Sequence, residues 1–308
     1  NLQKEILNLE CEETEKNRLL RNLMKLEEEH LNIMITGATG CGKSSTINAL
    51  FDTEVAKVGV GVDPETMEIT KFEFGNITLW DTPGLGDGKE ADNRHSKNII
   101  DKLLETDENG NPLIDLVLVI LDGSSRDLGT SYELINEVII KTIGPENSDR
   151  ILIAINQADI AMSGRYWNFK KNRPEKKLEE FLDKKVESVK NRIKEATGVE
   201  VDPIYYCAGY KEEGCMQTKP YNLTKLLSYI VDKTPSEKRI FYSEATNTDS
   251  TMWKHNDDLE DYRTNIFDSI KEGLGNALDL VGNFVSGVLG VIDSIGSFIG
   301  NVFGGLFW

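Results

Sequence analysis

The sequence predicts an α/β protein with a mostly parallel, six-stranded sheet and a helical domain formed by the two ends of the chain. From about residue 31 to residue 235, apolar runs typical of buried strands alternate with helical patterns, as in a parallel sheet covered on both faces. Residues 1–30 are rich in Glu, Lys, Arg and Leu and contain no Gly or Pro, which predicts a helix. Residues 264–308 show a second, glycine-rich amphipathic pattern.

The predicted elements follow one another in regular order. Strands are expected at residues 31–36, 68–74, 77–81, 114–121, 150–156 and 203–207. Helices are expected near residues 43–51, 90–106, 130–142, 174–197 and 223–233. Residues 236–263 are polar and acidic, which predicts a connector between the sheet domain (31–235) and the last segment (264–308).

Composition limits the classes of function. The 308 residues are 39% hydrophobic and 28% charged, as in soluble globular proteins. The net charge of −17 disfavours a broad surface for nucleic acid or anionic lipid, because both repel acidic proteins. The four cysteines lack metal-ligand spacing and residues 1–5 lack an apolar signal core, so reduced thiols and a cytoplasmic location are expected.

The first motif is Gly-Ala-Thr-Gly-Cys-Gly-Lys-Ser at residues 37–44, between the first strand and the first helix. It matches the phosphate-binding pattern G-x-x-x-x-G-K-S. Glycines let the backbone curl so that N–H groups point at phosphate oxygens, and the helix N-terminus adds its positive dipole end. We expect Lys43 to bridge the β- and γ-phosphates and Ser44 to bind Mg²⁺.

The second motif, Asp-Thr-Pro-Gly at residues 81–84, follows the strand at 77–81. Asp81 is expected to hold Mg²⁺ through a water molecule, and the Gly84 N–H to meet the γ-phosphate. Residues 85–88 are flexible enough to move when that phosphate leaves. In the preceding loop we expect Thr66 to bind both Mg²⁺ and the γ-phosphate, with Thr70 as the alternative.

The third motif indicates the base. The strand that begins near residue 150 ends in Asn-Gln-Ala-Asp at residues 156–159. The Asp159 carboxylate can accept hydrogen bonds from both N1–H and the amino group of guanine, a pair that adenine does not offer. Asn156 is expected to tie this loop to the phosphate loop. The last strand ends at Cys207 and Ala208, where the Ala208 N–H is expected to reach the guanine O6.

These motifs define a full set of predicted site residues. The residues expected to contact the nucleotide are Gly37, Thr39, Gly40, Cys41, Gly42, Lys43, Ser44, Ser45, Asp81, Gly84, Asn156, Gln157, Asp159, Cys207 and Ala208. Ser44, Thr66 and Asp81 are the expected Mg²⁺ ligands, and Lys43 and Thr66 the expected catalytic residues.

Together the motifs resemble the nucleotide-binding domain of the Era/TrmE-like P-loop GTPases. Residues 58–88 are similar to prophage-encoded bacterial GTPases of the YkfA/YfjP type, with a fainter similarity to immunity-related GTPases. The resemblance covers about residues 31–235. It implies GTP or GDP with Mg²⁺ as ligands, and hydrolysis of GTP to GDP and phosphate.

The chain departs from the family pattern at three positions. Gln157 stands where a lysine usually covers the base, and Cys207 stands where serine is usual. Leu85 occupies the place of the glutamine that orients water in Ras-like enzymes. Because leucine cannot orient water by hydrogen bonding, slow intrinsic hydrolysis is expected unless a partner or a second protomer completes the site.

A basic and aromatic patch lies at residues 163–177. Its members are Arg165, Lys170, Lys171, Arg173, Lys176 and Lys177, with Tyr166, Trp167 and Phe169. Such a patch can bind RNA by phosphate contacts and base stacking. It can equally form a protomer interface or a solvated helix start, so RNA or the ribosome is an alternative partner.

The C-terminal segment needs burial. Nine glycines lie between residues 273 and 305, and each costs a helix about 1 kcal/mol relative to alanine. Docking on the N-terminal helix and the nucleotide domain, insertion into lipid, and self-association through 274–308 are the three alternatives. The expected function is a nucleotide-controlled switch that repositions the terminal helices, at the inner face of a membrane or in a homodimer. An RNA-associated GTPase and a GTP-dependent scaffold with negligible turnover are the alternatives.

Overall fold

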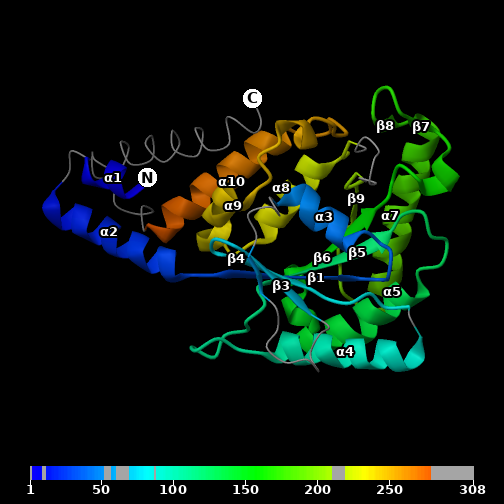
Figure 1. The fold of residues 1–308 in the computed structure, drawn as a ribbon, viewed down its shortest axis with the longest axis horizontal. Coiled ribbons are helices and arrows are strands. Elements are labelled where there is room, and N and C mark those ends of the chain that lie inside the picture. Colours follow the sequence, from blue (N-terminus) through cyan, green and yellow to red (C-terminus); the bar gives the residue numbers. More distant parts are fainter. Residues whose placement is uncertain are drawn as a thin grey trace.

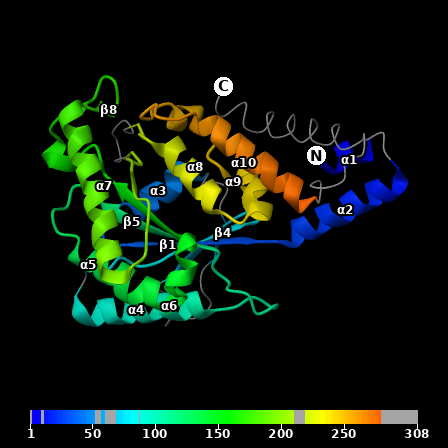
Figure 2. The same ribbon diagram turned by 180° about the vertical axis from the view of Figure 1, so that it is seen from behind.

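A seven-stranded sheet with helices on both faces forms the centre of the molecule (Figures 1 and 2). The computed structural model describes residues 2–8, 12–51, 57–59, 69–86, 88–209 and 219–278. The predicted α/β class with a mostly parallel sheet is confirmed. Thr66 and most of the glycine-rich C-terminal segment lie outside the described residues.

The strand order is β2-β3-β4-β1-β5-β6-β9. β3 is antiparallel to both of its neighbours, and the other pairs are parallel. All six predicted strands are present, and β2 is an additional short strand at one edge. The strands of this sheet are β1 (Leu31–Gly37), β2 (Lys57–Gly59), β3 (Thr70–Phe74), β4 (Ile77–Asp81), β5 (Leu116–Asp122), β6 (Ile151–Asn156) and β9 (Ile204–Tyr205).

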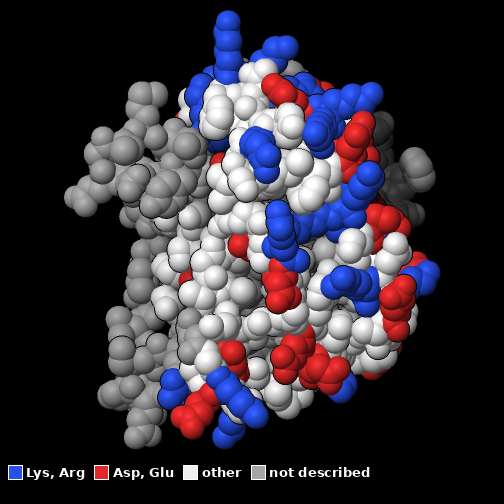
Figure 3. All heavy atoms as spheres, turned by 90° about the vertical axis from the view of Figure 1, so that its right-hand side faces the viewer, with Lys and Arg blue, Asp and Glu red and all other residues white. Residues whose placement is uncertain are grey.

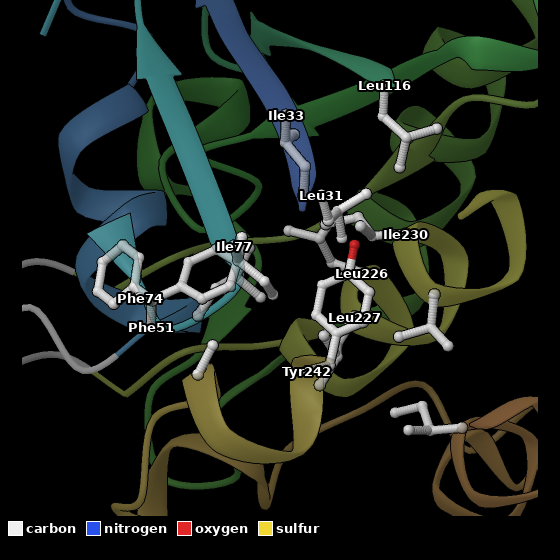
Figure 4. Packing of buried hydrophobic residues seen from close by; sticks show 14 of the residues in the cluster. Leu31, Ile33, Phe51, Phe74, Ile77, Leu116, Leu226, Leu227, Ile230 and Tyr242 are labelled. Atoms are coloured by element: carbon white, nitrogen blue, oxygen red, sulfur yellow. The ribbon is translucent and has the colours of Figure 1, made fainter. Parts of the chain in front are cut away.

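The central strand β1 divides the core into two layers, because successive side chains of a strand point to opposite faces. Ile33 and Ile35 belong to one buried cluster and Met34 to the other. The helices that contribute to the first cluster are α1 (Leu2–Leu7), α2 (Glu13–Glu28), α3 (Lys43–Leu50), α8 (Leu223–Lys233), α9 (Tyr242–Ala245) and α10 (Tyr262–Ala277). Those of the second are α4 (Lys89–Leu104), α5 (Gly129–Glu133), α6 (Ile140–Ile143) and α7 (Lys176–Thr197). Figure 4 shows strand residues such as Leu31 and Ile77 packed beside Leu226 and Tyr242.

Shorter elements complete the described fold. A π-helical stretch (Leu134–Ile139) joins α5 to α6, so the helix predicted at 130–142 contains a local change of winding. The remaining elements are the 3₁₀ helices η2 (Pro145–Arg150), η3 (Ala161–Gly164), η4 (Ser236–Phe241) and η5 (Ser250–Trp253), and the hairpin of β7 (Trp167–Asn168) and β8 (Arg173–Pro174).

The N-terminal region differs from the single helix predicted over residues 1–30. The structure has two helices, α1 (Leu2–Leu7) and α2, that lie against each other (Figure 1). This folding back buries Ile6, which is 1% exposed, and places the Lys16 ammonium 3.1 Å from the Leu7 carbonyl oxygen, to which it donates. Charged residues interrupt the apolar stripe, so one straight helix would leave Ile6 without a core to join.

Residues 236–263, predicted to be a polar connector, are packed onto the sheet domain instead. Tyr242 and Trp253 are fully buried, and the Trp253 indole N–H donates to the Asn247 carbonyl oxygen at 3.0 Å. The polar average composition of this stretch conceals its aromatic anchors, each of which buries a large apolar area.

Helix α10 docks on α8 and η4. For this part of the C-terminal segment, the structure agrees with the first of the three alternatives, docking on the rest of the protein. Ile270, Leu274 and Leu278 are fully buried on one face of this region, and the Asn22 side chain of α2 donates to the Leu278 carbonyl oxygen at 3.2 Å. Helices α2 and α10, which lie far apart in the sequence, therefore pack together. Within the described residues, no helix is both long enough and apolar enough to span a bilayer.

Two glycines of α10 provide a matched test of this docking. A Cβ at position 273 would lie 2.0 Å from the Ser236 carbonyl oxygen of η4, whereas one at position 275 would meet nothing within 4 Å. We expect Gly273→Ala to lower the free energy of unfolding by about 1–3 kcal/mol through overpacking. Gly275→Ala should raise it by about 0.5–1 kcal/mol through helix propensity. Urea denaturation of the full chain measures both, and effects of the same sign would contradict the docked position of α10.

Candidate nucleotide-binding site

The phosphate loop connects the end of β1 to the start of α3. Gly37, Gly40 and Gly42 have φ values of +151°, +79° and +92°, which side chains rarely adopt. A Cβ on Gly37 would lie 2.3 Å from the Ile120 carbonyl oxygen, and one on Gly42 would lie 2.2 Å from the Asn156 amide nitrogen. Gly37 and Gly42 are therefore required by their close neighbours as well as by the turn, whereas Gly40 is favoured by its positive φ alone.

Hydrogen bonds fix Lys43 and the first turn of α3 beside the ends of β1 and β9. The Lys43 ammonium donates to the carbonyl oxygens of Gly37 at 3.3 Å and Ala38 at 3.4 Å, so it lies across the mouth of its own loop. The Thr46 hydroxyl is 2.6 Å from the buried Tyr206 hydroxyl, which fixes the first turn of α3 beside the residue after β9. Ser44 is exposed on this turn and Ser45 is half-buried.

The third motif lies against the phosphate loop. The buried Asn156 side chain donates to the Cys41 carbonyl oxygen at 3.0 Å and accepts from the Ala208 N–H at 3.0 Å. Gln157 donates to the Gly40 carbonyl oxygen at 2.8 Å, in place of the usual lysine. The expected tie between Asn156 and the phosphate loop is present. The Ala208 N–H, by contrast, is already occupied, so a contact to guanine O6 requires it to turn from Asn156.

Asp159 lies close to the last strand. Its carboxyl is partly buried, and this burial raises its pKa, with backbone N–H groups acting in the opposite direction. The charge of Asp159 in turn contributes to the raised pKa of the buried Cys207 thiol. The neighbouring Ala158 N–H donates to the Tyr206 carbonyl oxygen at 3.2 Å, so the loop that carries Asp159 lies beside the last strand.

Asp81 follows from the second motif and stands at the end of β4. Its Oδ1 atom is buried and has no hydrogen-bond partner in the described part of the chain. Burial raises the pKa of this carboxyl to about 6, against the opposing charge of the nearby Lys43. An unpaired buried carboxylate oxygen is costly, and a bound cation or its water would satisfy it.

The donors present fit Mg²⁺. Asp81 and the Ser44 hydroxyl are oxygen donors of the kind this ion binds. No cluster of three or more Asp, Glu, His or Cys suited to a metal occurs among the described residues. Thr66 lies outside the described residues, and its rival Thr70 is an exposed residue of β3, paired in register with Asp81.

The loop after Asp81 is closed onto the phosphate loop. The Thr39 N–H donates to the Leu85 carbonyl oxygen at 2.9 Å, and the Leu85 N–H donates to the Gly37 carbonyl oxygen at 3.4 Å. A Cβ on Gly84 would lie 2.4 Å from the Thr39 hydroxyl oxygen, so only glycine fits there. The Leu85 side chain is 4% exposed and belongs to the core cluster around α4. Leucine at this position therefore packs into the core and does not face the site.

Two positioning groups escape sequence reasoning. The buried His95 of α4 has its Nδ1 3.1 Å from the Gly84 carbonyl oxygen, and no local motif announces this contact. Asp122 ends β5, and its carboxylate accepts from the Ser124 N–H and hydroxyl, both at 2.7 Å. The same strand-end rule that points to Asp81 could have found Asp122, because the carboxyl ends of parallel strands meet at one edge.

The two described cysteines of the site are free thiols. Cys41 and Cys207 are both buried, and burial raises the pKa of Cys41 to about 11. Cys11 and Cys215 lie outside the described residues.

Most side chains named below from the basic patch at 163–177 make contacts within the protein. Trp167 is buried and packs edge to face on Tyr221, with ring centroids 5.4 Å apart, and the Lys177 ammonium lies 4.6 Å from the centroid of the Tyr166 ring. Arg173 forms ion pairs with two carboxylates, and Phe169 is 79% exposed. Only one of the three aromatic side chains is therefore open for stacking, and the patch is a hairpin followed by α7.

The partly buried Asp81 carboxyl makes the nucleotide-free chain sensitive to pH. Because its pKa is about 6 in the folded state against a usual 3.8, the native state holds this proton more tightly than the unfolded chain does. The contribution of Asp81 to stability therefore falls as the pH rises from about 4 to about 6. We expect Asp81→Asn to raise the free energy of unfolding at pH 7.5 by about 1–3 kcal/mol and to flatten this part of the profile. Urea titrations without nucleotide at several pH values measure this free energy, and Asp101→Asn, at an exposed position of α4, is the control. An Asp81→Asn chain that is less stable than the unchanged chain at pH 7.5 would contradict the raised pKa of Asp81.

Comparison with known proteins defines the class. Residues 32–157 match the sequence model of a family described as "50S ribosome-binding GTPase". With the glycine-rich loop and the sheet described above, this part of the chain is a P-loop GTPase domain, a class that binds GTP or GDP with Mg²⁺ and hydrolyses GTP.

The chain is similar to YkfA and YfjP of Escherichia coli (strain K12), with 32% and 30% identity over 148 residues, or 47% of this chain and 47% of each relative. The chain thus spans about half the length of these relatives. Interferon-gamma-inducible GTPase 10 of Mus musculus is 41% identical over 70 residues, 21% of this chain and 17% of that protein. The predicted resemblance to both groups is confirmed. Toc33 from Arabidopsis thaliana in complex with Mg²⁺ and GMPPNP aligns over 67% of this chain and 82% of that chain, at 17% identity and a TM-score of 0.40.

Proposed function

We propose that the chain binds GTP and GDP with Mg²⁺, hydrolyses GTP slowly, and uses the change of nucleotide as a switch. One observation carries this proposal. The phosphate loop, the loop after Asp81 and the Asn156 loop are joined directly by hydrogen bonds at one edge of the sheet. A single nucleotide with its phosphates over the first loop would contact all three.

Each residue has a distinct proposed role. Lys43 turns from the carbonyl oxygens of its own loop to the β- and γ-phosphates, where a charge-assisted contact is stronger. Ser44 and Asp81, with Thr66, hold Mg²⁺, which neutralises charge on the phosphates. Asp159 accepts the two donors of guanine. Lys43 and Thr66 also stabilise the charge on the reacting phosphate.

Slow turnover follows from Leu85. Its side chain lies in the core and offers no hydrogen bond to an attacking water. We assign no described residue of the site as a base toward water, and faster hydrolysis would require a partner or a second copy of the chain. The same site with no measurable hydrolysis would make the protein a GTP-dependent scaffold, which is the second alternative.

The switch is proposed to act through the two contacts between Leu85 and the phosphate loop. A γ-phosphate that takes the Gly84 N–H must rearrange this loop. At the far end of α3, the Asn247 side chain donates to the Asn48 carbonyl oxygen at 3.1 Å, and Phe51 forms a backbone bridge with Thr246. These contacts link the nucleotide helix to the segment that supports α10. Repositioning of the terminal helices in an oligomer, or at the inner face of a membrane, is the proposed output.

Two measurements on the full chain test this function. Mg²⁺-dependent release of phosphate from GTP should occur and should disappear in Lys43→Ala. Flotation with liposomes, in GDP and in a non-hydrolysable GTP analogue, tests the membrane output. Nucleotide-dependent flotation supports it, and absence of flotation in both states contradicts it. Salt-sensitive RNA binding through the 163–177 patch would instead favour the RNA-associated alternative.

A further inference from the structure

A basic pocket lies on the face formed by α5, α7 and the loop after β5. It has a volume of about 520 Å³, and its lining includes Arg126, Arg165, Lys184, Lys185 and Arg192 but no Asp or Glu. Figure 3 shows Lys and Arg side chains forming a band across the upper and middle part of the face that carries the β7–β8 hairpin and α7. The site is separate from the phosphate loop, since none of residues 37–44 lines it.

Among the described residues, the charge of Asp122 acts on Lys185 and the Arg192 guanidinium lies 5.4 Å from the centroid of the Tyr132 ring, but the pocket cations have no carboxylate partner. Within the described residues, none of the five forms an ion pair with a carboxylate, although the chain carries a net charge of −17. Two other lysines of α7 behave differently, because Lys190 pairs with Asp202 and Lys194 pairs with Glu200. A concave group of unpaired cations focuses positive potential and attracts anions.

The shape and the other side chains indicate the size and class of the ligand. A volume of about 520 Å³ lies in the range of small-molecule sites. Tyr132 and Phe181 provide an aromatic wall, and Ser163 and Ser188 add neutral hydroxyl groups, whereas the hydroxyls of Ser124 and Ser125 already donate within their own loop. Arginine forks and lysine ammonium groups are the usual partners of phosphate oxygens. We propose that this pocket binds a small phosphorylated ligand carrying at least two phosphate groups.

One wall of the pocket connects it to the candidate nucleotide site. The Lys185 ammonium donates to the carbonyl oxygens of Gly123 at 2.7 Å and Ser125 at 2.6 Å, which holds the loop after β5. Within that loop the Gly123 N–H donates to the Asn156 carbonyl oxygen at 2.8 Å, and the Ser124 hydroxyl lies 3.4 Å from the Gln157 side-chain oxygen. An anion that draws Lys185 from these carbonyls would loosen the loop behind the third motif. The pocket ligand therefore changes how fast GDP leaves, a consequence that rests on the proposed function.

Binding is tested with inorganic tripolyphosphate on the full chain. The Lys43→Ala background keeps the probe off the phosphate loop, so the result does not depend on nucleotide binding. We expect calorimetry to detect one site, and the double change Lys184→Glu and Arg192→Glu to weaken it at least about 10-fold through loss of two charge-assisted contacts. The matched control, Lys190→Glu with Lys194→Glu, makes the same change of charge on the same helix outside the pocket. Equal weakening in both pairs, or no binding at all, would overturn the proposal.

A second experiment tests whether a ligand in the basic pocket changes the rate of GDP dissociation. In the otherwise unchanged chain, tripolyphosphate should alter the rate at which a pre-bound fluorescent GDP dissociates into excess GDP, and Lys184→Glu with Arg192→Glu should abolish this effect. Simple competition at the phosphate loop leaves a dissociation rate unchanged, so it cannot imitate the result. Both double variants are compared by circular dichroism and thermal unfolding. A dissociation rate indifferent to the probe would overturn the link while leaving the pocket itself supported by the calorimetry.

Discussion

Lys43→Ala is expected to weaken the binding of GTP and GDP by about 100-fold. The ammonium is the only side-chain cation placed on the described phosphate loop, and it lies within 3.4 Å of two carbonyl oxygens at the loop mouth. A hydrogen bond to a charged group contributes about 1.5–3 kcal/mol, and the phosphates would lose both this contact and the charge. Equilibrium titration with a fluorescent guanine nucleotide measures the change.

The control for this variant is Lys141→Ala, which removes an exposed lysine of α6 that pairs with Glu137. It should bind nucleotide as the unchanged chain does. Loss of the Lys43 side chain also frees two weak contacts to backbone carbonyls, so unfolding is measured in parallel. Undiminished binding of Mg²⁺–GTP by a folded Lys43→Ala chain would refute the phosphate-loop assignment.

Asp159→Asn is expected to reverse the preference for the base. The carboxylate accepts two donors of guanine, whereas an asparagine amide offers one donor and one acceptor and suits xanthine instead. Leaving polar groups mismatched in a partly buried pocket costs about 1–3 kcal/mol or more. GTP affinity should fall by about 10- to 100-fold, and xanthosine triphosphate affinity should rise by a similar factor.

Competition between the two nucleotides for the variant and the unchanged chain provides the measurement. Gln157→Ala is the informative companion, because Gln157 donates to the Gly40 carbonyl oxygen of the phosphate loop. It should weaken both nucleotides alike without changing the preference. An Asp159→Asn chain that still prefers GTP would discredit the contact to the base.

The sheet and most of the site follow from sequence because their signals are local. A strand of apolar residues followed by glycines and a lysine can adopt few other conformations, and Gly37 and Gly42 have neighbours that leave no room for a Cβ. Asn156 is predictable for a similar reason, because the buried polar side chain at the end of β6 needs hydrogen-bond partners and finds them in the adjacent loops. These are short-range constraints, and pattern reasoning captures them.

The remaining features depend on contacts between distant segments. Trp253 and Tyr242 sit in a polar stretch whose average composition hides them, yet both are buried in the main cluster. Helix α1 folds back because Ile6 is buried only by contacts with distant parts of the chain. The basic pocket likewise brings together residues between positions 124 and 192. The sequence predicts that Leu85 cannot orient water, but the packing of its side chain against the α4 side of the sheet is visible only in three dimensions.

The most direct test of the account is equilibrium binding of GTP, GDP and ATP to the full chain, each with and without Mg²⁺. We predict that GTP and GDP displace a fluorescent guanine nucleotide, that Mg²⁺ strengthens binding of GTP, and that ATP at the same concentrations does not compete. Equal competition by ATP, or no nucleotide binding at all, would contradict it.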